Sequence, residues 1–182
     1  MKSLTFITGN ATKVEHLARY LDFSIEQMKL DIPEIQSLDL EEVAADKAKA
    51  AFAVLRTPVL VEDTALTFEA LNGLPGPLVK YFLESIGNEG LTKLLAGYDN
   101  RAAVAETCFA ICDESGVHLF KGACKGRVAD FPKGDGYGWD PVFIPEGSEL
   151  TWAEFDFTQQ KGVSMRRLAS KKLQVYLEAH YK

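Results

Sequence analysis

Two adjacent acidic residues, Glu62 and Asp63, close the apolar run PVLV at residues 58–61. Carboxylates at the end of a strand suit a hard cation such as Mg²⁺, which takes oxygen ligands and bridges to phosphate groups. One carboxylate of the pair could instead hold an attacking water as a general base. A polar end is also common on a purely structural strand, so these interpretations stay open at this point. Glu34, in the segment DIPEIQ, is a further candidate carboxylate without a local signal of its own.

A candidate anion site lies near the N-terminus, in the sequence TGNATK at residues 8–13. Gly9 allows a tight turn, and Asn10 can cap the helix that follows. The first turn of a helix favours acidic residues because the helix N-terminus is partly positive, yet this turn holds Lys13 and no acid. Free backbone N–H groups and a lysine both suit a phosphate. The alternative is an ordinary solvated lysine, and the spacing is not that of a Walker A loop.

A second lysine interrupts an apolar helical stripe. Residues 40–55 carry apolar side chains at helical spacing, and Lys47 falls between Val43 and Ala44 around that helix. A lysine in such a stripe pairs with an acid, extends its charged end to solvent or contacts a ligand. The sequence leaves these three alternatives open.

Two further segments hold residue types that are unusual for a helix start or a loop. In KGVSMRR, at residues 161–167, Ser164 is placed to cap a helix whose first turn holds Arg166 and Arg167, which again indicates an anion or polar ligand. In YGWDP, at residues 137–141, two aromatic residues and Asp140 share a glycine-bearing loop. Aromatic faces stack on bases, and a carboxylate accepts hydrogen bonds from ring N–H groups. The alternative for this loop is a structural anchor.

The elements that position these residues alternate between strands and helices, which predicts an α/β or α+β class with a mixed sheet. No repeat or linker divides the chain, so we expect a single domain over residues 1–182. Residues 102–112 and 117–128 form a predicted hairpin around the turn DESG, and residues 131–149 are expected to be irregular. The other predicted strands are residues 3–8, 24–30, 58–62 and 64–68, and the predicted helices are residues 11–21, 40–55, 78–86, 89–96 and a last helix towards 180.

Composition excludes several classes of protein. The net charge is −6 and the isoelectric point is near 5.1, which argues against a nucleic-acid partner but allows a small phosphorylated ligand. No apolar stretch approaches the length of a membrane-spanning helix, so no membrane partner is expected. An odd number of cysteines, three, argues against a disulfide framework and fits a cytoplasmic location. The three histidines are scattered and predict no metal cluster.

Taken in order, TGNATK, DIPEIQ, VLVEDTALTFEALNGLPGPLVKYFLE, YGWDPVF and KGVSMRR resemble the inosine triphosphate pyrophosphatase family across nearly the whole chain. The resemblance implies an elongated central mixed β-sheet flanked by helices in two lobes, with the active cleft between them. It implies hydrolysis of deaminated purine nucleoside triphosphates (ITP, dITP, XTP) to the monophosphate and pyrophosphate, with Mg²⁺ as cofactor. It also implies a homodimer.

The resemblance assigns roles to the residues of these motifs. Glu34, Glu62 and Asp63 are expected to bind the metal, with Asp63, or its neighbour Glu62, also activating the water. The triphosphate and the base are expected to contact Thr8, Gly9, Asn10, Lys13, Lys47, Tyr137, Gly138, Trp139, Asp140, Lys161, Ser164 and Arg166.

Two residues depart from the family pattern. Tyr137 stands where the family has phenylalanine, which keeps the ring, and Met165 stands where the family has histidine. Methionine offers no hydrogen-bond donor to the 6-oxo group of a purine, so the base preference is predicted to be relaxed or to depend on Arg166 alone. The alternatives are therefore the same chemistry with another base specificity, or a nucleotide-binding protein without catalysis.

Overall fold

The computed structural model describes residues 4–155 and 164–181. The chain divides into two compact units. Unit 1 is formed by Met1–Asp63, Thr107–Gly122 and Arg166–Lys182, and unit 2 by Thr64–Glu106 and Ala123–Met165. Strands β3 (Val59–Phe68), β5 (Ala102–Asp113) and β6 (Gly116–Val128) contribute residues to both units.

The strands of the described chain form one mixed sheet in the order β2-β1-β3-β5-β6-β7, and β4 pairs with β3 outside this path. Strand β1 (Thr5–Ile7) is parallel to β2 (Glu26–Met28) and to β3, whereas β4 (Pro75–Gly76) is antiparallel to β3 and β7 (Phe143–Pro145) to β6. The predicted mixed α/β class is therefore confirmed. The expected cleft between lobes, and the single domain over residues 1–182, stay predictions.

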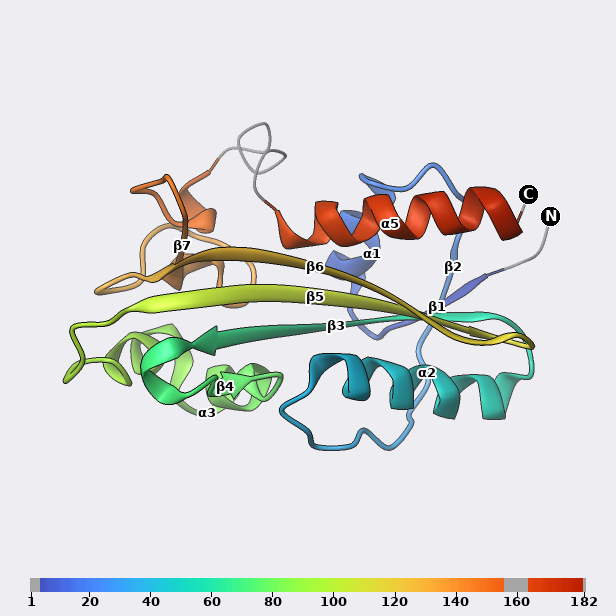
Figure 1. The fold of residues 1–182 in the computed structure, drawn as a ribbon, viewed down its shortest axis with the longest axis horizontal. Helices are drawn as coiled ribbons and strands as arrows, with labels where there is room; N and C mark the ends of the chain where they lie inside the picture. The colour runs from blue at the N-terminus through green and yellow to red at the C-terminus, as the bar shows by residue number, and fades with distance from the viewer. Residues whose placement is uncertain (1–3, 156–163, 182) are drawn as a thin grey trace. The chain divides into compact units, whose positions relative to one another are not determined.

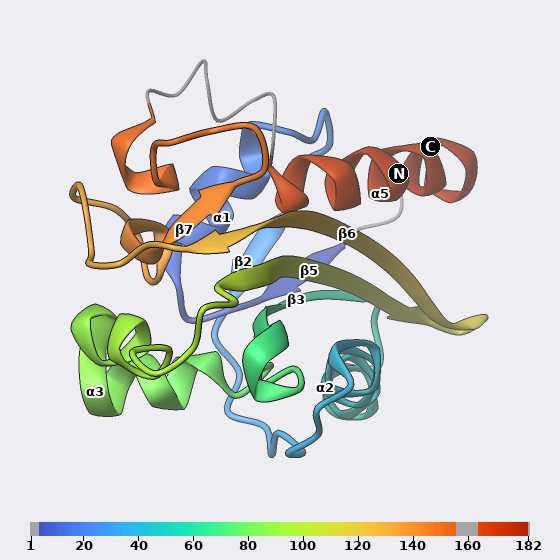
Figure 2. The same ribbon diagram turned by 60° about the vertical axis from the view of Figure 1, so that its left-hand side comes forward.

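Unit 1 carries a helix layer on each face of its strands (Figures 1 and 2). Helices α1 (Ala11–Ala18) and α5 (Met165–His180) cover one face, where Leu17, Leu173 and Leu177 join a buried cluster with sheet residues such as Phe6 and Phe109. Helix α2 (Leu40–Leu55) covers the opposite face with the predicted apolar stripe. The buried residues of that stripe are Leu40, Val43, Ala44, Ala48 and Ala51.

Unit 2 is built around a second buried cluster. Helix α3 (Val79–Lys93) contributes Val79 and Leu91, and the short helices η2 (Asp140–Val142) and η3 (Trp152–Glu154) contribute Val142 and Trp152. Gly87, with φ of 65°, interrupts α3, which explains why the sequence predicts separate helices at 78–86 and 89–96. The remaining short helix of the described chain is η1 (Glu69–Leu71).

Several predicted boundaries were wrong. Strands 58–62 and 64–68 are one strand, β3, because the acids between them continue the alternation of side chains instead of ending it. The segment 131–149, which was expected to be irregular, contains η2 and β7. Helix α1 ends at Ala18 and not at residue 21, α3 ends at Lys93, and β1 and β2 are shorter than predicted.

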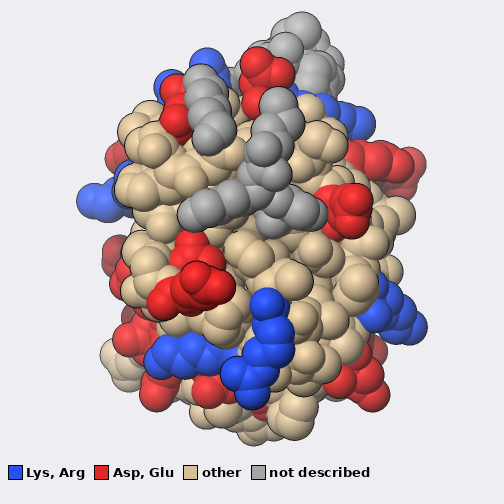
Figure 3. Space-filling model, turned by 90° about the vertical axis from the view of Figure 1, so that its right-hand side faces the viewer, with Lys and Arg blue, Asp and Glu red and all other residues tan. Residues whose placement is uncertain are grey.

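On the face drawn in Figure 3, acidic and basic side chains are interspersed and do not gather into a basic surface. No helix in the described ranges has the length and apolar character that crossing a bilayer requires.

Candidate active site

The segment between β1 and α1 adopts the predicted cap. Asn10 Oδ1 accepts a hydrogen bond from the Thr12 backbone N–H at 3.0 Å, and the Asn10 N–H donates to Thr8 Oγ1 at 3.1 Å. No acidic residue occupies the first turn of α1, and Lys13 projects from it. The Lys13 Nζ donates to the backbone carbonyl of Glu62 at 2.8 Å. The cap therefore brings the TGNATK lysine against strand β3.

Glu62 and Asp63 are consecutive residues of β3, so their side chains point to opposite faces of the sheet. Glu62 meets α5, where Arg166 Nε donates to its Oε1 at 2.7 Å. Asp63 meets α2, where Lys47 Nζ lies 3.1 Å from its Oδ1. The two acids therefore have different cationic partners, and the structure does not bring both carboxylates to one point.

Glu34 joins Asp63 through Lys47. The Lys47 Nζ is 2.6 Å from Glu34 Oε1 as well as 3.1 Å from Asp63 Oδ1. The side chains of Lys47 and Asp63 are 15% and 17% exposed, whereas that of Glu34 is 39% exposed. Of the three alternatives for the lysine in the apolar stripe, the structure shows pairing with acids.

Burial and neighbouring charge shift the pKa values of these groups in different directions. Burial alone would raise the pKa of Glu62, but Arg166 and Lys13 outweigh burial and hold that pKa below its usual value. For Asp63, burial raises the pKa by more than Lys47 and Lys13 lower it. Burial lowers the pKa of Lys13, whereas Asp63 and Glu34 overcome burial and raise the pKa of Lys47.

Each acid of β3 has one buried oxygen without a hydrogen-bond partner among the described residues, Glu62 Oε2 and Asp63 Oδ2. A buried acceptor without a partner costs about 1–3 kcal/mol, and more when it is charged. A cation or a water at Asp63 Oδ2 would remove that cost. The carboxylates of Asp63 and Glu34 converge on one ammonium group, so the donor set fits a single hard cation such as Mg²⁺.

His16 belongs to the surroundings of this site, although the sequence did not single it out. It lies one turn after Lys13 on α1, half-buried, and burial and then the charge of Arg166 lower its pKa, while Glu62 opposes them. Its spacing of three residues from Lys13 places both side chains on one face of the helix, and this was the signal that could have identified it.

The loop YGWDP, residues 137–141 in unit 2, is anchored by a buried tryptophan. Trp139 is 6% exposed and packs against Trp152 and Phe143, with ring centroids 5.7 Å and 6.0 Å away. Gly138, with φ of 62°, turns the chain, and its carbonyl accepts a hydrogen bond from Asn88 Nδ2 at 3.0 Å. The structural-anchor interpretation therefore describes Trp139, and the sequence did not identify Asn88.

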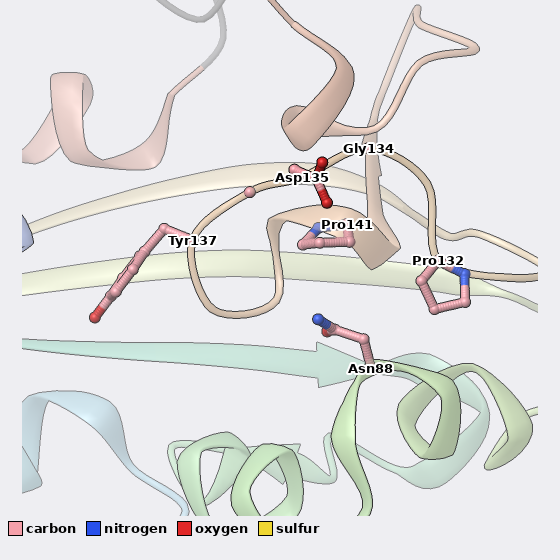
Figure 4. Close-up of a pocket in the computed structure, with 7 residues that line it drawn as sticks. Asn88, Pro132, Gly134, Asp135, Tyr137 and Pro141 are labelled. Atoms are coloured by element: carbon pink, nitrogen blue, oxygen red, sulfur yellow. The ribbon is translucent and has the colours of Figure 1, made fainter.

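A cavity of about 610 Å³ borders this loop (Figure 4). Asn88 points towards the loop from α3, and the Tyr137 side chain extends away from the other labelled lining residues. Asp140 opens η2, and its backbone N–H donates to the Tyr137 carbonyl at 3.1 Å. The lining residues are Asn88, Pro132, Gly134, Asp135, Gly136, Tyr137 and Pro141.

The last motif is only partly described. Lys161 lies outside the described residues, and Ser164 immediately precedes α5. Met165 is 1% exposed and belongs to the buried cluster of unit 2, together with Trp139 and Val142. Met165 therefore packs in a core, while the neighbouring Arg166 pairs with Glu62.

Comparison with known proteins gives matches over nearly the full chain. The sequence model of the Ham1 family matches residues 4–176. An inosine triphosphate pyrophosphatase 2 of Trypanosoma cruzi is 45% identical over 98% of this chain and 91% of its own length. A dITP/XTP pyrophosphatase of Methanopyrus kandleri is 44% identical over 90% of each chain. The solved structure of the Staphylococcus aureus Ham1 protein superposes with a TM-score of 0.85 at 27% identity, covering 98% of this chain and 99% of that one.

Proposed function

Because the chain belongs to the Ham1 family, we propose that it hydrolyses deaminated purine nucleoside triphosphates (ITP, dITP and XTP) to the monophosphate and pyrophosphate. The names of its relatives, inosine triphosphate pyrophosphatase and dITP/XTP pyrophosphatase, support this substrate class. The observation that carries the proposal is the meeting of Glu34, Asp63 and Lys47 within 3.1 Å, with Lys13 of α1 bound to the backbone carbonyl of the neighbouring Glu62.

The geometry supports a different role for each of the charged groups. Glu34 and Asp63 would hold Mg²⁺, which when bound would neutralise and polarise the phosphate chain. Lys13 and Lys47 offset the charge that develops on the leaving pyrophosphate. Water attacks the α-phosphorus, the bond from that phosphorus to the α–β bridging oxygen breaks, and the proton of the water passes to Asp63.

Asp63 suits the role of base better than Glu62. Glu62 accepts from Arg166 at 2.7 Å, and its pKa lies below the usual value because, although burial opposes it, Arg166 and Lys13 favour the ionised form. Both acids keep one oxygen without a partner among the described residues, but only for Asp63 does burial outweigh the neighbouring cations and raise the pKa. Glu62 then acts by orienting Arg166 and not by touching the water or the metal.

A second candidate function is the same chemistry with relaxed base specificity. Met165 offers no hydrogen-bond donor, and its side chain is buried in the core of unit 2. A site that hydrogen-bonds its substrate can discriminate by about 10⁴-fold, and an apolar contact by far less. This candidate predicts comparable turnover of ATP and ITP.

We also propose a homodimer in the cytoplasm. The buried free thiols of Cys108 and Cys112 support a reducing compartment. The resemblance to the inosine triphosphate pyrophosphatases supports the dimer, which light scattering on the purified protein tests.

The chemistry is tested by hydrolysis of ITP in ¹⁸O-labelled water. Attack at the α-phosphorus puts the label in inosine monophosphate and leaves pyrophosphate unlabelled. Label in pyrophosphate or in orthophosphate would contradict the proposed bond cleavage. Tight binding of ITP without hydrolysis would instead favour the remaining alternative, a nucleotide-binding protein without catalysis.

A further inference from the structure

The two carboxylates assigned to the metal already share a cation that the chain itself supplies. Lys47 Nζ lies 2.6 Å from Glu34 Oε1 and 3.1 Å from Asp63 Oδ1. Glu34 comes from the segment before α2, and Asp63 from β3, so a helix side chain joins two separate parts of unit 1. Without that ammonium group, the two acids would lose the cation that they share, and the Asp63 side chain is only 17% exposed.

A metal ion bound to the same oxygens would compete with this ammonium group. Two cations at contact distance from the same pair of carboxylates repel each other strongly in a partly buried site. Lysine has a flexible four-carbon stem, so its charged end can move while its backbone stays in α2. Displacement becomes favourable when a second anion is present to receive the ammonium group.

The protein alone also supplies few ligands for a metal ion. The described residues contain no group of three or more His, Cys, Asp or Glu side chains placed to hold a metal ion. Mg²⁺ is commonly bound by one or two carboxylates together with substrate phosphates and waters. Two carboxylates held by a lysine fit that pattern, because the phosphates would bring the missing oxygen ligands and an anion for the lysine.

We propose that Lys47 holds the place of the metal in the free enzyme, and that Mg²⁺ enters with the triphosphate, displacing the Lys47 ammonium group from Glu34 and Asp63 towards the phosphates. This inference rests on the proposed function for the identity of the ligand. It makes Lys47 a positioning residue for the acids in the free state and a phosphate-binding residue in the complex.

Metal binding without nucleotide tests the inference directly. Mn²⁺ serves as the probe, and its free fraction is measured by electron paramagnetic resonance. Lys47→Met keeps the length of the side chain and removes the charge, so we expect Mn²⁺ to bind the variant at least tenfold more tightly than the original protein. With chelator present, the same variant should bind ITP more weakly. Equal or weaker Mn²⁺ binding by Lys47→Met would overturn the inference.

A matched control and a second variant separate this effect from a general change in charge. Lys49→Met removes a positive charge from an exposed position of the same helix and should leave the Mn²⁺ affinity unchanged. Adding Asp63→Asn to Lys47→Met should abolish the gain, because it removes a ligand. If Lys47→Met folds only when Mn²⁺ is added, that rescue supports the inference, and failure to fold in both conditions contradicts it. Since no nucleotide takes part, the Mn²⁺ result is independent of whether ITP is hydrolysed.

Discussion

The buried ion pair between Glu62 and Arg166 gives a prediction whose size follows from the structure. The Glu62 side chain is 1% exposed and that of Arg166 is 12% exposed, with 2.7 Å between Oε1 and Nε. Removing one partner of such a pair costs about 3–5 kcal/mol, because the other charge stays buried. Glu62→Gln retains a neutral acceptor for Arg166, so we expect the lower end, about 3 kcal/mol. For a chain of this length that lowers Tm by about 6–12 °C.

The loss of stability in Glu62→Gln should depend on pH, and the direction of that dependence follows from the pKa of Glu62. Although burial opposes it, Arg166 and Lys13 lower the pKa of Glu62 in the folded state. A lowered pKa stabilises the protein above the unfolded value of about 4.3, and this stabilisation is lost as the pH falls through the folded value. The difference in Tm between the original protein and Glu62→Gln should therefore be largest near pH 7 and shrink below about pH 4.

Thermal unfolding with a matched control and a double-mutant cycle provides the assay. Glu149→Gln breaks the pair with Arg127 and should lower Tm by no more than about 4 °C, because Glu149 is 91% exposed and Arg127 is 42% exposed. Combining Glu62→Gln with Arg166→Met should cost less than the sum of the single variants. Additive costs, or a Tm of Glu62→Gln within about 2 °C of the original, would refute the reasoning.

Three further variants test other parts of the account. Asp63→Asn should lower kcat by about 10³-fold or more, since it removes the base, while ITP binding with chelator present stays within a few fold, and near-normal turnover would refute that assignment. Asn88→Ala removes the donor to the Gly138 carbonyl and should raise KM for ITP about 2–10-fold at unchanged kcat in steady-state assays, whereas an unchanged KM argues against a base-binding role for the loop. Asp113 accepts from Tyr181 Oη at 2.7 Å, and although burial opposes it, hydrogen bonds from Ser115 and Tyr181 lower its pKa. Asp113→Asn should therefore cost about 1–2 kcal/mol in urea unfolding at pH 7 and much less near pH 3, and an equal cost at both would contradict this.

Local chemistry in the sequence was enough to predict the elements near the site. The cap by Asn10 and the helix 40–55 were correct because both depend on residues within one turn of each other. The breach of the apolar stripe by Lys47 left three alternatives open, and the structure shows pairing with acids. The class and the mixed sheet followed from the order of these elements.

Other features depend on tertiary contacts that no local pattern encodes. Glu34 has no signal of its own, and its role follows only from meeting Lys47 across 13 residues of chain. The acids Glu62 and Asp63 follow an apolar run, and this suggested a strand end. In the structure β3 continues through both acids, because cations on both faces of the sheet compensate their charges. Strand β7 is only three residues long and ends in Pro145, so pattern alone missed it.

The central claim is tested most directly by pyrophosphate release from ITP, XTP, dITP, ATP and GTP, each with Mg²⁺ and with chelator. The account predicts metal-dependent release from ITP, XTP and dITP. Equal release from all five would keep the chemistry and assign relaxed specificity to Met165, whereas strong preference for ITP over ATP would refute that role of Met165. No release from any nucleotide would contradict the proposed function.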